Sequence, residues 1–172
     1  MFGRPSRRGR ITSTVVLTCL VTASLIGPST AGAASDVKVT ITADLDGKPI
    51  DLILVGKYHC QDFDYPRIHC YSDANLLAGA VTSILALTGV DYVLVFDQSW
   101  YAGASMYISQ NYTALATLGW NDRISSMKAR NSESGIFWTD WFYGGSSYGF
   151  CCNLNYPGLG AYDNTFSSVY RT

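Results

Sequence analysis

Two six-residue segments near the C-terminus carry closely spaced side-chain oxygens. The first reads Asn-Asp-Arg-Ile-Ser-Ser over residues 121–126, and the second reads Asp-Asn-Thr-Phe-Ser-Ser over residues 163–168. Carboxylate, amide and hydroxyl oxygens, together with backbone carbonyls, are the ligands that Ca²⁺ takes, six to eight at a time. We therefore predict a Ca²⁺-binding loop in each segment.

The position of each residue in its loop predicts its role. The third position, Arg123 or Thr165, differs in chemistry between the copies, as expected if only its backbone carbonyl contacts the ion. Each loop has one formal carboxylate, which indicates a modest affinity, on the order of 10⁻⁶–10⁻³ M. The candidate side-chain ligands are Asn121, Asp122, Ser125, Asp163, Asn164 and Ser167.

The same residue types also form ordinary turns, because Asn, Asp and Ser side chains hydrogen-bond their own backbone. For one isolated loop we would prefer that simpler interpretation. Here both loops begin 25 residues after an aromatic residue, Phe96 or Trp138, that opens a similar hairpin pattern. The shared register favours a duplicated metal site over two unrelated turns.

The elements that must position these loops repeat with a period of 42 residues and no insertion. In each copy an aromatic residue, a second aromatic five residues later and a glycine describe a folded hairpin whose aromatics pack across two strands. One such unit leaves its apolar face uncovered, so two units are expected to pack face to face. The recurring pairs are Phe96/Trp138, Trp100/Phe142, Tyr101/Tyr143, Gly103/Gly145, Ser105/Ser147 and Trp120/Tyr162.

This period predicts an all-β domain over residues 91–172, with repeats at 92–133 and 134–172. Its strands are expected near 92–97, 104–109 and 124–130, and again near 135–139, 146–151 and 166–171. A short third strand is expected near 113–118 in the first repeat and near 155–159 in the second.

Residues 35–90 precede this domain and have a different composition. Alternating apolar residues over 36–55, with a turn at Asp46-Gly47, predict a strand hairpin whose second strand covers 50–55. A cysteine-containing loop follows over 58–72.

A helix is predicted from Asp73 to Leu87. Ser72 or Asp73 can cap its start, and Gly89 can end it. Its apolar stripe, which we expect to pack into a core, consists of Leu76, Leu77, Ala80, Val81, Ile84 and Leu85.

Four cysteines lie beyond the N-terminal apolar run, and disulfides are expected if the chain is exported. We favour a Cys60–Cys70 bond, because Pro66 lies between them and can turn a short hairpin. Cys151 and Cys152 are adjacent, and in a strand their side chains point to opposite faces, so a bond between them is expected to be strained. A cross-link from the N-terminal segment to one of them is the competing arrangement.

Catalytic chemistry is not predicted. The histidines, His59 and His69, each precede a cysteine, and a Zn²⁺ site built from these four residues is a less favoured alternative to the disulfide. No Ser-His-Asp set and no phosphate-binding glycine loop is discernible. We therefore expect the protein not to be an enzyme.

The first 34 residues resemble a secretory signal. Four arginines precede an apolar run, Val15 to Ile26, that is too short to span a bilayer, and small residues follow it. Cleavage would leave 8 of the 12 basic residues against all 13 acidic ones. We predict a secreted, extracellular and acidic chain with no nucleic-acid partner and no stable membrane insertion.

Both oxygen-bearing loops resemble the (N/D)(N/D)xx(S/T)S motif of the Ca²⁺-binding microbial βγ-crystallins, and the hairpin pattern resembles that family's signature. The resemblance implies a two-Greek-key sandwich, preceded here by a disulfide-containing segment and one helix. It implies that each Ca²⁺ site takes ligands from both repeats. It also adds the residue after the first hairpin aromatic, Asp97 or Thr139, as a carbonyl ligand.

The predicted function is a secreted Ca²⁺-binding structural or binding protein stabilised by two Ca²⁺ ions. A weaker resemblance to secreted bacterial metalloproteinase inhibitors of the same fold makes inhibition of an extracellular protease one alternative. The other alternative is a cell-wall, glycan-binding or toxin-like module, suggested by the aromatic residues Trp100, Trp138, Trp141 and Tyr143.

Overall fold

The computed structural model describes residues 39–172. The predicted signal segment, 1–34, lies outside the described residues, so export stays a prediction. Lys38–Thr172 form one compact unit. Among the helices of this part of the chain, none combines the length and apolarity that crossing a membrane requires.

The N-terminal segment opens with a short hairpin. Strand β1 (Thr42–Leu45) pairs antiparallel with β2 (Lys48–Ile50) across the predicted turn. The prediction of a strand over 50–55 is wrong, because a 3₁₀ helix, η1 (Leu52–Lys57), follows β2. A Cβ on Gly56 would lie 2.2 Å from the carbonyl oxygen of Gly119, so this tight turn brings two backbones together. A short apolar run does not by itself distinguish a strand from such a turn.

The cysteine loop forms a second hairpin, and the predicted helix follows it. Strand β3 (His59–Asp64) pairs with β4 (Arg67–Tyr71), and α1 (Ala74–Thr88) contacts both strands. Asp73 accepts a hydrogen bond from the Asn75 amide at 2.7 Å, and Gly89 ends the helix with φ at 60°. The helix is therefore confirmed. Of its predicted stripe, only Leu77 and Val81 are buried.

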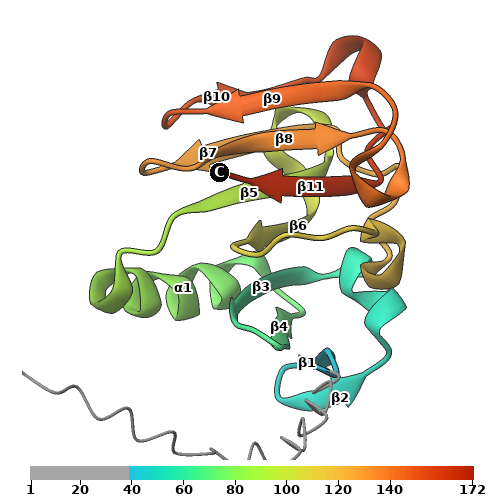
Figure 1. The fold of residues 1–172 in the computed structure, drawn as a ribbon. Helices are drawn as coiled ribbons and strands as arrows, with labels where there is room; N and C mark the ends of the chain where they lie inside the picture. Colours follow the sequence, from blue (N-terminus) through green and yellow to red (C-terminus); the bar gives the residue numbers. More distant parts are fainter. Residues whose placement is uncertain (1–38) are drawn as a thin grey trace, which may run out of the picture. The chain divides into compact units, whose positions relative to one another are not determined.

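The two repeats supply strands to two sheets (Figure 1). The strands of the repeats are β5 (Tyr92–Gln98), β6 (Ala102–Ile108), β7 (Ser126–Arg130), β8 (Ser134–Trp138), β9 (Ser147–Cys151), β10 (Asn155–Tyr156) and β11 (Ser168–Arg171). One sheet has the order β10-β7-β5-β6-β3-β4-β1-β2, and the other has the order β11-β8-β9. Because β3 pairs in parallel with β6, the N-terminal strands extend the sheet of the first repeat.

The repeats also exchange segments with each other. Strand β10 of the second repeat pairs with β7 of the first, and Tyr112 of the first repeat bridges to Val169 in β11. This reciprocal crossover is a Greek-key arrangement, so the predicted fold class is confirmed. The prediction of a strand near 113–118 is wrong, because a 3₁₀ helix, η3 (Leu115–Leu118), forms there. A 3₁₀ helix has three residues per turn, so Leu115 and Leu118 lie on the same side, and both are buried.

One buried cluster joins the two repeats. Trp120, Phe137 and Phe166 are its largest fully buried side chains, and the rings of Phe137 and Phe166 stack 5.0 Å apart. Trp120 immediately precedes the first oxygen-bearing loop. Ile124 and Phe166 occupy the same position in the two loops, and both are fully buried. The core therefore anchors each loop by an apolar side chain.

The structure forms two disulfides. Cys60 and Cys70 face each other across β3 and β4 and are bonded, which confirms the favoured pairing and leaves neither thiol for Zn²⁺. Cys151 and Cys152 are bonded to each other, so the competing cross-link from the N-terminal segment to one of them is wrong. The expectation of a strained bond assumed a continuous strand, whereas β9 ends at Cys151 and Cys152 has a left-handed φ of 70°.

Candidate metal centre

Each repeat turns its first hairpin through two consecutive left-handed aromatic residues. In η2 (Ser99–Tyr101), Trp100 and Tyr101 have φ values of 60° and 65°. In η4 (Trp141–Tyr143), Phe142 and Tyr143 have values of 56° and 64°. Such values are uncommon for residues with a side chain, so other contacts must hold both turns in place.

The last serine of each loop supplies those contacts. Ser126 Oγ donates to the Gln98 carbonyl at 2.6 Å and accepts from the Tyr101 amide at 3.0 Å. In the second repeat, Ser168 Oγ donates to the Asp140 carbonyl at 2.7 Å and accepts from the Tyr143 amide at 3.1 Å. The sequence analysis gave these serines no role, although their recurrence at the 42-residue period was a signal for one.

The two loops cross and hold each other by backbone hydrogen bonds. The Asp122 amide donates to the Phe166 carbonyl at 2.9 Å, and the Asn164 amide donates to the Ile124 carbonyl at 3.0 Å. Asp122 and Asn164 adopt matching left-handed φ values of 52° and 53°. Each loop therefore carries its second residue toward the opposite repeat.

The crossing creates two pairs of facing side-chain oxygens. The Ser167 hydroxyl donates to Asp122 Oδ1 at 3.4 Å, and the Ser125 hydroxyl donates to Asn164 Oδ1 at 3.1 Å. Both serines are 4% exposed. We call the first pair, with Thr139, the Asp122 site, and the second pair, with Asp97, the Asn164 site. Each pair thus joins a residue of one repeat to a residue of the other, and the role of these oxygens as Ca²⁺ ligands stays a prediction.

The other predicted ligands border these pairs. Thr139 follows Trp138, whose carbonyl accepts the Ser167 amide at 2.8 Å, and Asp97 follows Phe96, whose carbonyl accepts the Ser125 amide at 2.9 Å. Asn121 and Asp163 do not contact the serine of the opposite loop; each lies beside its neighbour, with Asn121 Nδ2 2.7 Å from Asp122 Oδ2 and Asn164 Nδ2 3.3 Å from Asp163 Oδ2.

Backbone carbonyls are available at the third loop position. Among the hydrogen bonds of residues 39–172, none ends on the carbonyl oxygen of Arg123 or Thr165. The Thr165 hydroxyl donates to the Tyr162 carbonyl at 2.8 Å, and the Arg123 side chain turns toward the Gly119 carbonyl at 3.2 Å. Both side chains are thus used for local contacts, and a ligand role for the two carbonyls stays a prediction.

The two sites differ in charge. The Asp122 site has the Asp122 carboxylate, with Asp140 beside it, and no ion pair in the described chain involves either residue. The Asn164 site has an amide at the corresponding position. Of the carboxylates near it, Asp163 lies beside the Asn164 amide at 3.3 Å, and Asp97 is paired with Arg123 at 2.8 Å, with Asp97 Oδ1 buried without a partner.

The oxygen spacing fits a Ca²⁺ ion. Two ligands about 2.4 Å from one ion and about 90° apart lie roughly 3.4 Å from each other, close to the spacing of both pairs. Within residues 39–172 there is no cluster of three or more His, Cys, Asp and Glu residues that could hold a metal. The oxygens that face each other between the loops are carboxylate, amide and hydroxyl oxygens, and such a set could hold a hard cation.

A pocket opens at the Asp122 site, with a volume of about 530 Å³. It is lined by Asn121, Asp122, Thr139, Asp140, Trp141 and Ser167. The Trp141 indole donates from Nε1 to Asn121 Oδ1 at 2.9 Å, and its side chain is 53% exposed. Trp141 is one of the aromatic residues that suggested a cell-wall or glycan-binding module, whereas no sequence pattern pointed to Asp140.

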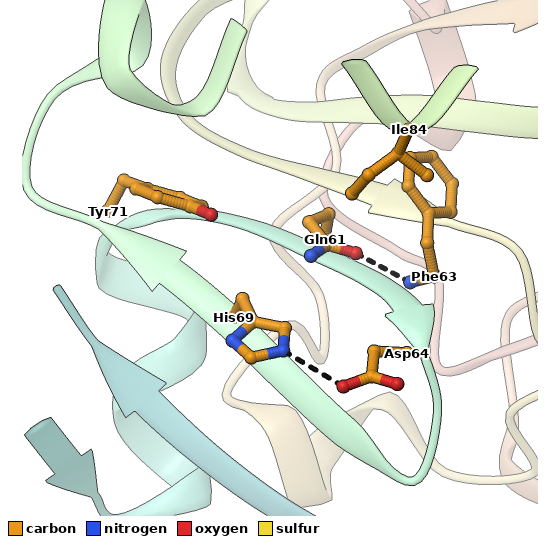
Figure 2. A pocket seen from close by; sticks show the side chains of 6 residues that line it. All are labelled: Gln61, Phe63, Asp64, His69, Tyr71 and Ile84. Atoms are coloured by element: carbon orange, nitrogen blue, oxygen red, sulfur yellow. Dashed lines mark hydrogen bonds and ion pairs between the residues drawn. The ribbon is translucent and has the colours of Figure 1, made fainter. Parts of the chain in front are cut away.

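A second pocket, of about 410 Å³, lies between α1 and the β3–β4 hairpin (Figure 2). His69 borders it, held between Asp44 at 2.9 Å and Asp64 at 3.2 Å. Its other lining residues are Gln61, Phe63, Tyr71 and Ile84. No serine or cysteine is among the residues that line this pocket.

Comparison with known proteins gives similarities of structure. No protein-family model matches the chain, and no curated protein matches it. A βγ-crystallin from Ciona intestinalis is 24% identical, with 47% of this chain and 99% of that one covered and a TM-score of 0.43. A βγ-crystallin domain from Flavobacterium johnsoniae is 25% identical, with 46% and 92% covered and a TM-score of 0.42.

An archaeal βγ-crystallin is 22% identical, with 48% of this chain and 99% of that one covered and a TM-score of 0.43. The predicted resemblance to βγ-crystallin domains is therefore confirmed. The assignment of a Greek-key fold rests on the strand pairing between the repeats and on the crossed loops. The weaker resemblance to metalloproteinase inhibitors stays a prediction.

Proposed function

We propose that this chain is an exported Ca²⁺-binding protein whose βγ-crystallin-like domain is stabilised when its crossed loops bind the ion. One observation supports this most: each loop sends a side-chain oxygen across the repeat boundary to face a buried serine hydroxyl, at 3.4 Å and 3.1 Å. An ordinary turn bonds its own backbone and needs no such reciprocal arrangement.

Binding at these positions would stabilise the domain because the ligands come from both repeats. The loops approach each other only in the folded chain, so an ion held between them binds the native state and not the unfolded one. Such an ion would be coordinated at the same time by oxygens of both repeats, which face each other across the crossed loops. The role that follows is structural or adhesive, and no catalytic step is part of it.

The Asp122 site is the tighter of the two. Its carboxylates, Asp122 and Asp140, are not neutralised by an ion pair in the described chain, whereas Asp97 is engaged by Arg123. A charged ligand raises the affinity for a hard cation more than an amide does. Two ions are therefore expected, bound with unequal affinities.

Thermal unfolding in chelator and in millimolar Ca²⁺ tests the proposal. The melting temperature should rise with Ca²⁺ by several degrees, since saturation at about a hundredfold excess over Kd contributes roughly 2.7 kcal/mol. The Asp122→Asn variant should lose most of the rise. Asp51→Asn makes the same charge change at an exposed residue far from the loops in sequence and should keep the full rise. Identical melts with and without Ca²⁺ would reject the proposal.

A further inference from the structure

The pocket at the Asp122 site has features that the fold does not require. At the 42-residue offset, Asp140 and Trp141 correspond to Gln98 and Ser99 in the first repeat. Both hairpins nevertheless adopt the same left-handed turn and the same serine anchor. The carboxylate and the indole are therefore additions to the second repeat that its backbone does not need.

Trp141 is held in an exposed position by specific contacts. Its indole nitrogen is bonded to Asn121 in the opposite loop at 2.9 Å, and its carbonyl accepts the Gly144 amide at 3.2 Å. The neighbouring Phe142 amide donates to the Thr113 carbonyl at 2.7 Å. A large apolar side chain fixed at the surface, 53% exposed, is presented to a ligand at little further cost in side-chain entropy.

The pocket lining defines the chemistry of that ligand. Beside the indole lie the carboxylates of Asp122 and Asp140, the Asn121 amide and the hydroxyls of Thr139 and Ser167. An aromatic wall with several hydrogen-bond acceptors suits a molecule that has an apolar C–H face and hydroxyl donors around its edge. A pyranose ring has this form, and about 530 Å³ is room for one or two such rings.

The negative charge of the pocket argues against the main alternative classes of ligand. Two carboxylates repel phosphate, sulfate and nucleic acid. A basic peptide would suit the bare pocket, but a Ca²⁺ ion at the Asp122 site would compensate the carboxylates and leave neutral hydroxyl groups as the better match. The indole, whose nitrogen is hydrogen-bonded to Asn121, also forms a flat surface. A peptide side chain would need a deep apolar groove instead.

We propose that the pocket bordered by Trp141, Asp140 and Asp122 binds a neutral saccharide, with a sugar ring against the Trp141 indole and sugar hydroxyls on the surrounding oxygens. The inference rests on the proposed Ca²⁺ site for its charge argument. Trp141 would make the apolar contact, and Asp140 would accept from a hydroxyl group.

The test uses the chain from residue 35 onward with its disulfides intact. Binding to insoluble cellulose, chitin and mannan is measured by co-sedimentation, and binding to cellobiose, N,N′-diacetylchitobiose, lactose and mannobiose by calorimetry, all in millimolar Ca²⁺. We expect at least one glycan to bind. Trp141→Ser, which copies the residue of the first repeat, should weaken binding by about tenfold or more, as loss of one aromatic contact implies.

A matched control is Trp100→Ser, which removes an even more exposed indole (77%) from the equivalent hairpin of the first repeat. It should leave glycan binding unchanged. The Ca²⁺-dependent rise in melting temperature is measured in parallel and should persist in Trp141→Ser. These two readouts distinguish failure of the saccharide proposal from failure of the Ca²⁺ proposal.

Failure to bind any of these glycans, while Ca²⁺ still stabilises the chain, would overturn the saccharide site and leave the proposed function standing. Equal loss in Trp141→Ser and Trp100→Ser would also overturn it, as would tight binding of a lysine-rich peptide in place of the sugars. Glycan binding that depends on Trp141 supports the site.

Discussion

The Asp122 and Asn164 sites are built from one repeated pattern and yet differ in charge. Both have a buried serine, a left-handed second loop residue and a hairpin held by the last loop serine. At the Asp122 site a carboxylate faces the serine. At the Asn164 site an amide does, and the adjoining Asp97 is already paired with Arg123. The backbone conformation of the loops is the same in both copies, whereas the charge of the side chain that faces the serine differs.

This difference separates the residues that hold the fold from the residues that would contact the proposed ligands. Positions that are equivalent in both repeats, such as Ser126 and Ser168, hold the hairpins. Positions that differ, such as Asp140 against Gln98 and Trp141 against Ser99, lie at the pocket of one site. Comparison of the two repeats therefore identifies the residues that the shared backbone requires, because these residues are equivalent in both.

The largest expected effect comes from placing a cation in each site. Ser167→Arg should lower Ca²⁺ affinity at the Asp122 site by at least about a hundredfold, since the guanidinium repels the ion and displaces a ligand. Ser125→Arg should remove only the weaker binding step. Calorimetric titration separates the two steps, and circular dichroism verifies the fold. Indistinguishable losses in the two variants would mean that the sites are equivalent.

The stability of the folded chain also depends on pH through Asp62, a residue outside the two loops, and this dependence applies equally to variants of either site. Burial raises the pKa of Asp62 from 3.8 to about 6, outweighing its hydrogen bonds from the Ser109 amide at 2.6 Å and the Tyr112 hydroxyl at 2.9 Å. The folded chain therefore holds this proton to higher pH than the unfolded chain does. The resulting stability is fully present below about pH 3.8 and is lost as the pH rises through about 6.

The loss should amount to about 2–3 kcal/mol of unfolding free energy, measured by denaturant unfolding across this window. Asp62→Asn should show no such decline, while its Ca²⁺ response at pH 7 stays that of the unmodified chain. A decline of equal size in the variant would assign the pH effect to other carboxyl groups.

Replacing the amide tests whether charge causes the difference between the sites. Asn164→Asp gives the Asn164 site the carboxylate that the other site has, and should raise its affinity for Ca²⁺ by about tenfold. The two calorimetric steps should then move closer together. If the weaker step does not change, the cause lies in the Arg123–Asp97 pair instead.

The smallest expected effect comes from that pair. Arg123→Gln leaves Asp97 without its partner and should lower the stability of the Ca²⁺-free chain by about 1 kcal/mol, a modest value because the pair is partly exposed. The Ca²⁺-induced rise in melting temperature should become larger, since Asp97 then contributes an uncompensated charge. A smaller rise than in the unmodified chain would show that Arg123 supports the site instead of weakening it.

The internal repeat makes the site loops predictable from the amino-acid sequence alone. Two matching loops and hairpins at a fixed offset identify the fold, and the spacing of apolar residues identifies the helix, with a capping residue at each end. The Cys60–Cys70 bond follows from a proline between the cysteines. These features depend on local sequence or on an internal comparison, which a single chain provides.

Other features depend on long-range contacts that local patterns do not encode. The 3₁₀ helix at Leu52–Lys57 follows from the close approach of Gly56 to Gly119, which no local pattern reveals. The bond between Cys151 and Cys152 requires the left-handed turn at the end of β9. The pocket around Trp141 is not predictable from the repeat, because Asp140 and Trp141 are positions at which the two repeats differ.

Calcium titration of the chain from residue 35 onward, by calorimetry, with and without Asp122→Asn, tests the central claim most directly. The account predicts two binding steps in the unmodified chain and a selective weakening of the tighter step in the variant, by about tenfold or more, with the weaker step unchanged. Absence of any binding heat together with an unchanged melting temperature, or loss of only the weaker step in the variant, would contradict it.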